Sequence, residues 1–237
     1  MSLRFEAVEL ALAEFTLELD LELTRRATLV VGPSGAGKSS LLELVAGLRR
    51  PRRGRVVLEG EALDDVARAL HLPPPARGVG WVPQEGALFP HLDVRGNLIY
   101  GARGARGEGS PRGDAPMPDG VIERLELGAL LGRDVGSLSG GEQRRVAIGR
   151  ALLSGARLLL VDEPFAGLDR ARRARVADAL FRVKDELGVR ALVVSHDLDG
   201  LSGWAEEIVV LERGAVVARG EPAALLEHDP EAVRLRS

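Results

Sequence analysis

Residues 32–40 read Gly-Pro-Ser-Gly-Ala-Gly-Lys-Ser-Ser, and this order of residue types suits the binding of phosphate groups. The glycines at 32, 35 and 37 allow backbone angles and close approaches that a Cβ would block, so successive amides can point at one set of phosphate oxygens. Lys38 can reach the terminal phosphates of a nucleotide, and the hydroxyl of Ser39 can ligate Mg²⁺. The pattern predicts a nucleotide site formed by Gly32, Pro33, Ser34, Gly35, Ala36, Gly37, Lys38, Ser39 and Ser40.

The segments on either side of this loop are of the kind that would hold it. Residues 27–31 read as a buried strand and residues 39–46 as a helix. A helix that begins near Lys38 adds the positive end of its dipole to the site. A glycine-rich turn that binds nothing is the alternative, and the strand and helix around the loop argue against it.

Two further apolar runs end in residues that could act on a bound phosphate. Residues 157–163 predict a buried strand that ends at Asp162 and Glu163, and residues 189–195 predict another that ends before His196. Asp162 could hold Mg²⁺, and Glu163 could orient or deprotonate an attacking water molecule. Adjacent acids after a strand are often only solvated, and a lone histidine is usually structural. The phosphate loop in the same chain favours the catalytic interpretation.

Three other features are ambiguous on their own. Ser139, Gly140 and Gly141 open a predicted helix over residues 139–153, which would offer a second anion-binding helix N-terminus or only a capped helix with Ser139 as N-cap. Gln84 ends a short apolar run over residues 79–84. Phe15 could stack on a nucleotide base or pack in the core.

Alternation of apolar and polar residues over 15–23 predicts an antiparallel strand with one solvated face. Other predicted elements are a strand within 3–12 with a turn at 11–14, a strand over 55–58, a surface loop over 101–120, helices over 121–131 and 169–187, a hairpin over 207–218 that turns at Arg213-Gly214, and a helix over 222–227.

Composition excludes several classes of protein. The 32 basic and 35 acidic residues give a net charge of −3, which provides no electrostatic footprint for nucleic acid. Without cysteine, neither a disulfide framework nor a thiolate metal site is possible. The first residues do not read as a signal peptide, and no run of 18 uncharged apolar residues is present. We expect a cytosolic protein, or one bound to a membrane only through a partner.

The phosphate loop, Gln84, Leu-Ser-Gly-Gly-Glu at 138–142, Asp162-Glu163, Gly-Leu-Asp at 167–169 and His196 together resemble the ordered motifs of ATP-binding cassette (ABC) proteins. The resemblance implies an α/β fold: a P-loop NTPase core with an antiparallel β-subdomain and an inserted helical subdomain over about residues 85–154. It implies a single ABC-type nucleotide-binding domain over 1–237. Because the sequence ends at Ser237, just after the predicted terminal helix, we expect no C-terminal regulatory domain and no feedback inhibition through this subunit.

The resemblance also implies roles for individual residues. ATP would be held by the loop and Lys38, with Mg²⁺ held by Ser39, Gln84 and Asp162. Glu163 would be the general base, and His196 would contact the γ-phosphate. The segment Ser139, Gly140 and Gly141 would reach ATP bound to a second copy of the chain, with Asp169 at that dimer interface. Glu142 departs from the glutamine that the family usually has.

Within the family, a transporter ATPase is favoured. A DNA-repair ATPase would need a long coiled-coil insertion and a ribosome-associated ATPase a second cassette, and the sequence has neither. Residues 85–98 resemble importer ATPases, most closely those for molybdate or tungstate, although cassettes for sulfate, ferric iron, thiamine and polyamines share much of the segment. Implied partners are a second copy, membrane permease subunits and, indirectly, an extracytoplasmic solute-binding protein, with the chain at the cytoplasmic face of the membrane. Leu88, Phe89 and Pro90 would line a groove for a permease helix, or only pack together.

Overall fold

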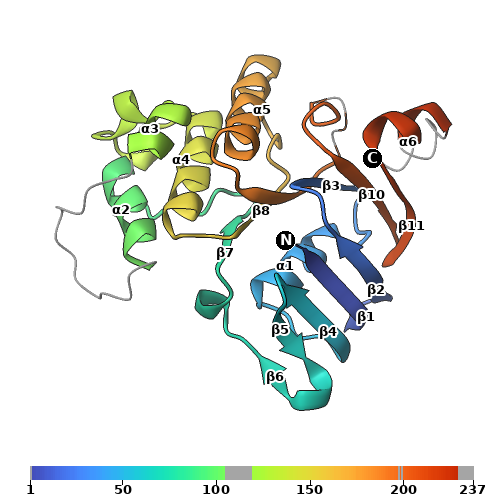
Figure 1. Cartoon of the computed structure of the whole chain (residues 1–237). Coiled ribbons are helices and arrows are strands. Elements are labelled where there is room, and N and C mark those ends of the chain that lie inside the picture. The colour runs from blue at the N-terminus through green and yellow to red at the C-terminus, as the bar shows by residue number, and fades with distance from the viewer. Residues whose placement is uncertain (1, 105–118, 197, 199, 229–237) are drawn as a thin grey trace. The chain divides into compact units, whose positions relative to one another are not determined.

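The computed structural model describes residues 2–104, 119–196, 198 and 200–228 (Figure 1). The chain divides into two compact units, each described here by itself. The first comprises Met1–Arg77 and Ala191–Ser237, and the second comprises Gly78–Arg190. Most of the loop predicted over 101–120 lies outside the described residues.

An antiparallel sheet forms one part of the first unit. Its strand order is β2-β1-β4-β5-β6. The strand bounds are β1 (Leu3–Ala11), β2 (Thr16–Leu23), β4 (Arg53–Leu58), β5 (Glu61–Asp65) and β6 (Leu70–His71). Along the chain, the short 3₁₀ turn η1 (Val66–Arg68) lies between β5 and β6, and the 3₁₀ turn η2 (Pro74–Ala76) follows β6. In β2, Leu17, Leu19 and Leu23 are buried and the residues between them are mostly exposed, as the alternation predicted. The turn predicted near residues 11–14 joins β1 to β2.

The strand that leads into the phosphate loop is fully buried. This strand, β3 (Ala27–Val31), pairs in parallel with β9 (Arg190–Val194) on one side and with β10 (Glu207–Glu212) on the other. The expected hairpin is confirmed: β10 pairs antiparallel with β11 (Ala215–Gly220) across a turn at Arg213-Gly214. In the described part of this unit, helix α1 (Lys38–Ala46) follows β3 and helix α6 (Pro222–His228) follows β11.

The second unit is mainly helical around one pair of parallel strands. Strand β7 (Val79–Val82) pairs with β8 (Leu158–Asp162). The helices are α2 (Val94–Gly104), α3 (Asp119–Arg124), α4 (Gly140–Leu153) and α5 (Arg170–Asp185), with 3₁₀ turns η3 (Gly128–Leu130) and η4 (Val135–Ser137). Helix α4 is the central one, because it contacts α2, α3, α5 and β7. Among the described residues, no helix has the length and apolar character needed to cross a bilayer.

Two sequence predictions are wrong in their bounds. The predicted loop over 101–120 begins and ends in helix, because α2 continues through Gly104 and α3 starts at Asp119. Gly101 lies so close to α4 that a Cβ there would be 2.2 Å from the carbonyl oxygen of Arg150, so tertiary packing outweighs the low helix propensity of glycine. The helix predicted over 121–131 ends at Arg124, since Glu126 has a φ of 54°, which no α-helix accommodates.

Candidate functional site

The phosphate loop connects β3 to α1 in the first unit. Gly32 is required by close packing, because a Cβ there would lie 2.0 Å from the carbonyl oxygen of Leu211. Gly37 has a φ of 101° and forms the N-cap of α1 without a side-chain hydrogen bond. Lys38 is 7% exposed, and its Nζ donates to the carbonyl oxygens of Gly32 (2.7 Å) and Pro33 (3.0 Å). The ammonium group is therefore held against the loop, where phosphate oxygens would compete for it.

Phe15 lies immediately before β2 and is half-buried. Its ring is next to two glycines: a Cβ on Gly37 would be 3.6 Å from Phe15 Cε2, and one on Gly214 would be 2.7 Å from Phe15 Cδ2. The contact with Gly214 is packing within the unit. Stacking of Phe15 on a base stays a prediction, and the ring's place beside the last glycine of the loop is compatible with it.

His196 is exposed and follows β9 in the first unit. The N–H of Ser195 donates to the carbonyl oxygen of Val30 (3.1 Å), two residues before Gly32. Because β3 and β9 are parallel neighbours, their carboxyl ends lie at one edge of the sheet. The register therefore brings His196 to the edge from which the phosphate loop departs.

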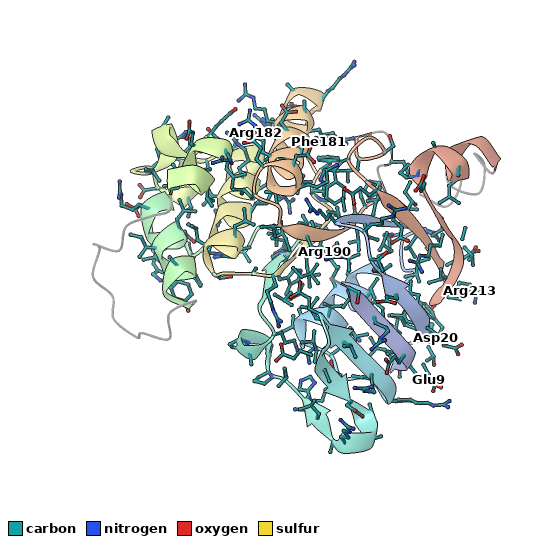
Figure 2. All side chains as sticks on the ribbon, viewed as in Figure 1. Glu9, Asp20, Phe181, Arg182, Arg190 and Arg213 are labelled. Atoms are coloured by element: carbon teal, nitrogen blue, oxygen red, sulfur yellow. The ribbon has the colours of Figure 1, made fainter. Side chains whose placement is uncertain are left out.

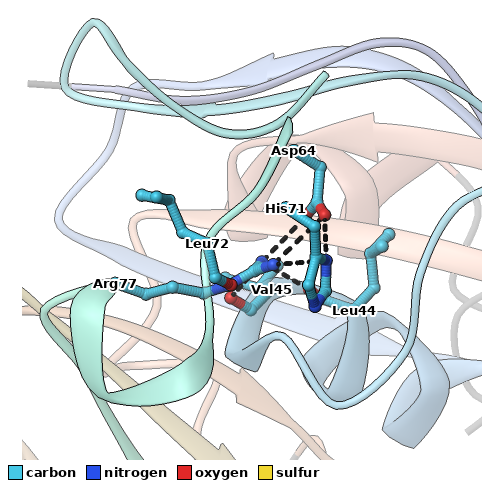
Figure 3. A network of polar contacts seen from close by, with 6 residues as sticks. All are labelled: Leu44, Val45, Asp64, His71, Leu72 and Arg77. Carbon is cyan, nitrogen blue, oxygen red and sulfur yellow. Dashed lines mark hydrogen bonds and ion pairs between the residues drawn. The ribbon is translucent and has the colours of Figure 1, made fainter. Parts of the chain in front are cut away.

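A buried polar network holds the other end of α1 (Figure 3). Arg77 is fully buried, and its Nη1 donates to the carbonyl oxygens of Leu44 (3.0 Å) and Val45 (3.2 Å) in the last turn of α1. The same guanidinium forms a forked pair with Asp64, at 2.8 Å from Nη1 to Oδ2 and 3.1 Å from Nη2 to Oδ1. His71 completes the network, with Nδ1 2.6 Å from Asp64 Oδ1. Arg77 thus satisfies C-terminal carbonyl groups of the helix whose N-terminus carries Lys38.

The second unit carries the carboxylates. Val82 of β7 pairs with Val161 of β8, so the residues that follow, Gln84 on one strand and Asp162-Glu163 on the other, lie at the same edge. Asp162 is 6% exposed, whereas Gln84 is exposed. Glu163 has a φ of 44°, and its carbonyl oxygen accepts from the N–H of Ala166 (3.1 Å). Left-handed backbone at a non-glycine residue is strained and is concentrated at functional sites.

Arg144 is a residue of this edge to which the sequence interpretation gave no role. It is 5% exposed, and its Nη1 donates to the carbonyl oxygen of Pro83 (3.0 Å), directly before Gln84. Burial lowers the pKa of Arg144, and the charges of Asp162 and Glu163 oppose that shift, so the guanidinium acts on both carboxylates. Helical spacing in the sequence could have pointed to Arg144. Gly141, Arg144 and Ile148 follow one another at intervals of three and four residues, so they share one face of α4, and that face is buried.

Ser139 is the N-cap of α4, as predicted, and a capping box is present. The N–H of Glu142 donates to Ser139 Oγ (3.4 Å), and the N–H of Ser139 donates to Glu142 Oε2 (2.7 Å). That second bond is the main reason why the pKa of Glu142 is lowered, with a smaller contribution from the charge of Arg133. Glu142 Oε1 pairs with Arg133 Nη1 at 3.2 Å, which gives a physical use for glutamate at this position. Gly140 is exposed and Gly141 is buried beside it.

Two more features of the second unit concern the partners expected from sequence. Asp169 is the exposed N-cap of α5, where its Oδ1 accepts from the N–H of Arg172 (2.9 Å). Phe89 is half-buried, and its ring lies 4.5 Å from that of Tyr100 and under the guanidinium of Arg150, 4.9 Å from Cζ. Tyr100 is 58% exposed, so an aromatic surface is available on α2.

The structure therefore assembles the predicted residues in two groups. In the first unit, the sheet edge brings the phosphate loop and His196 together, with Phe15 beside the loop. In the second unit, the ends of β7 and β8 bring Gln84 and the two carboxylates together, with Ser139, Gly140 and Gly141 at the start of α4.

Comparison with known proteins supplies the context for both groups. A family model described as "ABC transporter" matches residues 16–166. The molybdenum import ATP-binding protein ModC of Rhizobium meliloti (strain 1021) is 45% identical over 226 residues, which are 95% of this chain and 62% of that protein. The protein of the same name from Escherichia coli (strain K12) is 45% identical over 193 residues, 81% of this chain and 53% of its own length. The chain spans between half and two thirds of the length of these relatives.

Solved structures agree with the family match. An ATP-binding cassette of an ABC transporter in its ADP conformation superposes with a TM-score of 0.79 at 25% identity, covering 99% of this chain and 98% of its own. A dimeric ATP-binding cassette in a post-hydrolysis state, bound to ADP and Pi, gives a TM-score of 0.70 at 25% identity over 93% of this chain and 98% of its own. The fold class predicted from the sequence is confirmed.

Proposed function

Because the chain belongs to the ABC transporter family, we propose that it binds and hydrolyses ATP as the energy-supplying subunit of an importer for molybdate or tungstate. The choice of solute rests on the 45% identity to a molybdenum import ATP-binding protein over 95% of this chain. The likeness of residues 85–98 to importers of the same solutes is in keeping with that similarity and is not separate from it.

The first unit would bind the triphosphate. Backbone N–H groups of the loop, which Pro33 lacks, the N-terminus of α1 and the ammonium group of Lys38 offer donors and positive charge to phosphate oxygens. The bonds from Lys38 to the carbonyl oxygens of Gly32 and Pro33 support this role, because they hold the charge at the loop in advance. His196, at the same edge, would donate to the γ-phosphate.

Water activation would belong to the second unit. Glu163 would accept a proton from the attacking water, and its strained backbone supports a positioned role. Arg144 would hold the backbone before Gln84 and offset part of the negative charge of the two carboxylates. Asp162, buried at the end of β8, is a carboxylate that a cation can neutralise.

The donor set suits Mg²⁺. Ser39, Gln84 and Asp162 offer hydroxyl, amide and carboxylate oxygens, which are the hard ligands that this ion takes alongside phosphate oxygens. When bound, the ion supplies neutralisation of phosphate charge during transfer.

The proposal has consequences for assembly. Residues 1–237 would act as one nucleotide-binding domain, with a helical subdomain over about residues 85–154. Two copies would bind ATP jointly, with Ser139, Gly140, Gly141 and Asp169 reaching the nucleotide held by the partner. Permease subunits would dock on the surface around Phe89 and Tyr100 at the cytoplasmic face of the membrane, and a solute-binding protein would deliver the ion on the other side. The exposed aromatic surface supports that docking.

The test is Glu163→Gln in steady-state ATPase assays with Mg²⁺. The variant should bind ATP normally and hydrolyse it about 10²–10⁴-fold more slowly, because the general base is lost. In cells, the same allele should lower uptake of molybdate and leave uptake of sulfate unchanged. Normal hydrolysis by the variant would remove Glu163 from the reaction, and loss of sulfate uptake instead would reassign the solute.

A further inference from the structure

Helices α3, α4 and α5 of the second unit surround a cavity of about 240 Å³ that is rich in arginine. We call it the arginine cavity. Its ionisable lining residues are Arg124 on α3, Glu126 after α3, Arg145 on α4, and Arg175, Asp178 and Arg182 on α5. At roughly 30 Å³ per water molecule, this volume holds about eight waters, so a small ion fits with part of its hydration shell.

The deepest guanidinium of the arginine cavity has an unused donor. Arg145 is 6% exposed, and its Nη1 donates to the carbonyl oxygen of Leu125 (3.1 Å) and to Glu126 Oε2 (3.3 Å). Its Nε is buried without a hydrogen-bond partner among the residues that the structure describes. Buried donors in native proteins are almost always paired, so this unpaired donor adds to the uncompensated positive charge around the cavity.

The charge of the arginine cavity is not balanced by its own carboxylates. Glu126 is shared, because its Oε1 also lies 3.0 Å from Nη1 of Arg182, which is labelled on α5 in Figure 2. The same Nη1 donates to the carbonyl oxygen of Arg124 in α3 (2.8 Å). Arg124 pairs with Glu186, outside the lining, at 2.9 Å. Arg175 is exposed and forms no ion pair within the described part of the chain. The lining of the arginine cavity has four guanidinium groups and two carboxylates, those of Glu126 and Asp178. When the carboxylate of Glu186 is counted with them, one positive charge remains in excess.

We propose that the arginine cavity binds a small tetrahedral dianion, of the class that includes sulfate, phosphate and molybdate. Planar guanidinium groups bind such oxyanions through paired charge-assisted hydrogen bonds. Three guanidinium groups line the arginine cavity from two helices, those of Arg145 on α4 and of Arg175 and Arg182 on α5. An ion there offsets the excess charge. It also ties α5 to α4, the helix whose N-cap is Ser139.

This site is separate from the phosphate loop, because all its lining residues lie in the second unit and the loop lies in the first. The inference stands without the proposed transport function, since it uses only the charge, burial and volume of the cavity. Its test is therefore direct binding of an ion, with no measurement of ATP hydrolysis or of solute uptake.

The experiment is calorimetric titration of the whole protein, loaded with MgADP, with sodium sulfate, phosphate or molybdate at constant ionic strength. Each should bind saturably at one site, and the order of the three affinities identifies the preferred ion. Arg175→Gln and Arg182→Gln should each weaken binding by at least about tenfold, because each removes charge-assisted hydrogen bonds. Arg170→Gln is the matched control, since Arg170 is exposed on α5 outside the lining and should leave the affinity unchanged.

Several results would overturn the proposal. One is the absence of saturable binding, and another is wild-type affinity in the Arg175→Gln/Arg182→Gln double variant. A third is a loss of affinity in Arg170→Gln as large as in the cavity variants, which would indicate only general attraction of anions. Lys38→Ala provides the remaining check. Loss of the signal in that variant would place the ion at the phosphate loop, and its retention supports the arginine cavity.

Discussion

At the scale of single residues, Glu142 offers a test by pH. Its pKa is lowered chiefly by the hydrogen bond from the N–H of Ser139, so its charged form stabilises the folded state. That stability is fully present above the unfolded value of 4.5 and is lost as the pH falls through the lower folded value. Glu142→Gln keeps an acceptor for Ser139 but loses the pair with Arg133. We expect its free energy of unfolding to be lower than wild type by up to about 1 kcal/mol at pH 7, with the difference closing below pH 4.5.

Urea denaturation at several pH values measures this difference. Glu123→Gln is a matched control, because Glu123 is exposed on α3 and forms no ion pair within the described residues. It should change the stability little at any of these pH values. A Glu142→Gln difference that grows on acidification would mean that the carboxylate is not stabilised as its contacts indicate.

At the scale of elements, the buried fork between Arg77 and Asp64 should be a main support of α1. Arg77→Met leaves the carboxylate of Asp64, which is 1% exposed, without its forked partner, and leaves the carbonyl oxygens of Leu44 and Val45 without the guanidinium donor. Removing one member of a buried pair costs about 3–5 kcal/mol. We expect a loss of that size in the free energy of unfolding, measured by urea denaturation.

Arg68→Met is the control for Arg77→Met. Arg68 also pairs with an aspartate of β5, Asp65, but at 3.6 Å and with a side chain that is 77% exposed. Exposed pairs contribute about 0–1 kcal/mol, so this variant should be close to wild type. Similar losses in the two variants would contradict the importance of burial in the network.

An element could be predicted from the sequence where the pattern that forms it lies within its own residues. Strand β3 and the hairpin of β10 and β11 follow from apolar runs and a turn, and both are confirmed. Helix α2 continues through Gly101 because Arg150 lies against it, and that contact is distant in sequence. The forked pair of Arg77 and Asp64 and the position of Arg144 beside the carboxylates also depend on contacts between residues distant in sequence. They were not predicted, because a single sequence does not state which residues meet across the fold. The motif residues were predicted because each motif is contiguous.

At the scale of the whole molecule, the proposal predicts that two copies associate only when ATP is held. Glu163→Gln with MgATP should give a dimer by light scattering, since slow hydrolysis preserves the complex. Adding Gly141→Asp should abolish dimerisation, because a carboxylate at the start of α4 would repel the phosphates of the partner's ATP.

The fold should accept this change, because the nearest atoms to the new Cβ all belong to Arg172, at ordinary contact distances of 3.4 Å (Cβ) and 3.8 Å (Cγ and the carbonyl oxygen). An acid near a helix N-terminus is also favourable. Gly136→Asp in the same Glu163→Gln background is the matched control, because Gly136 is exposed and a Cβ there meets nothing within 4 Å. It should still dimerise. If Gly141→Asp dimerised equally well while both variants kept wild-type thermal stability, the start of α4 would not face the nucleotide of a partner, and association would have to use another surface.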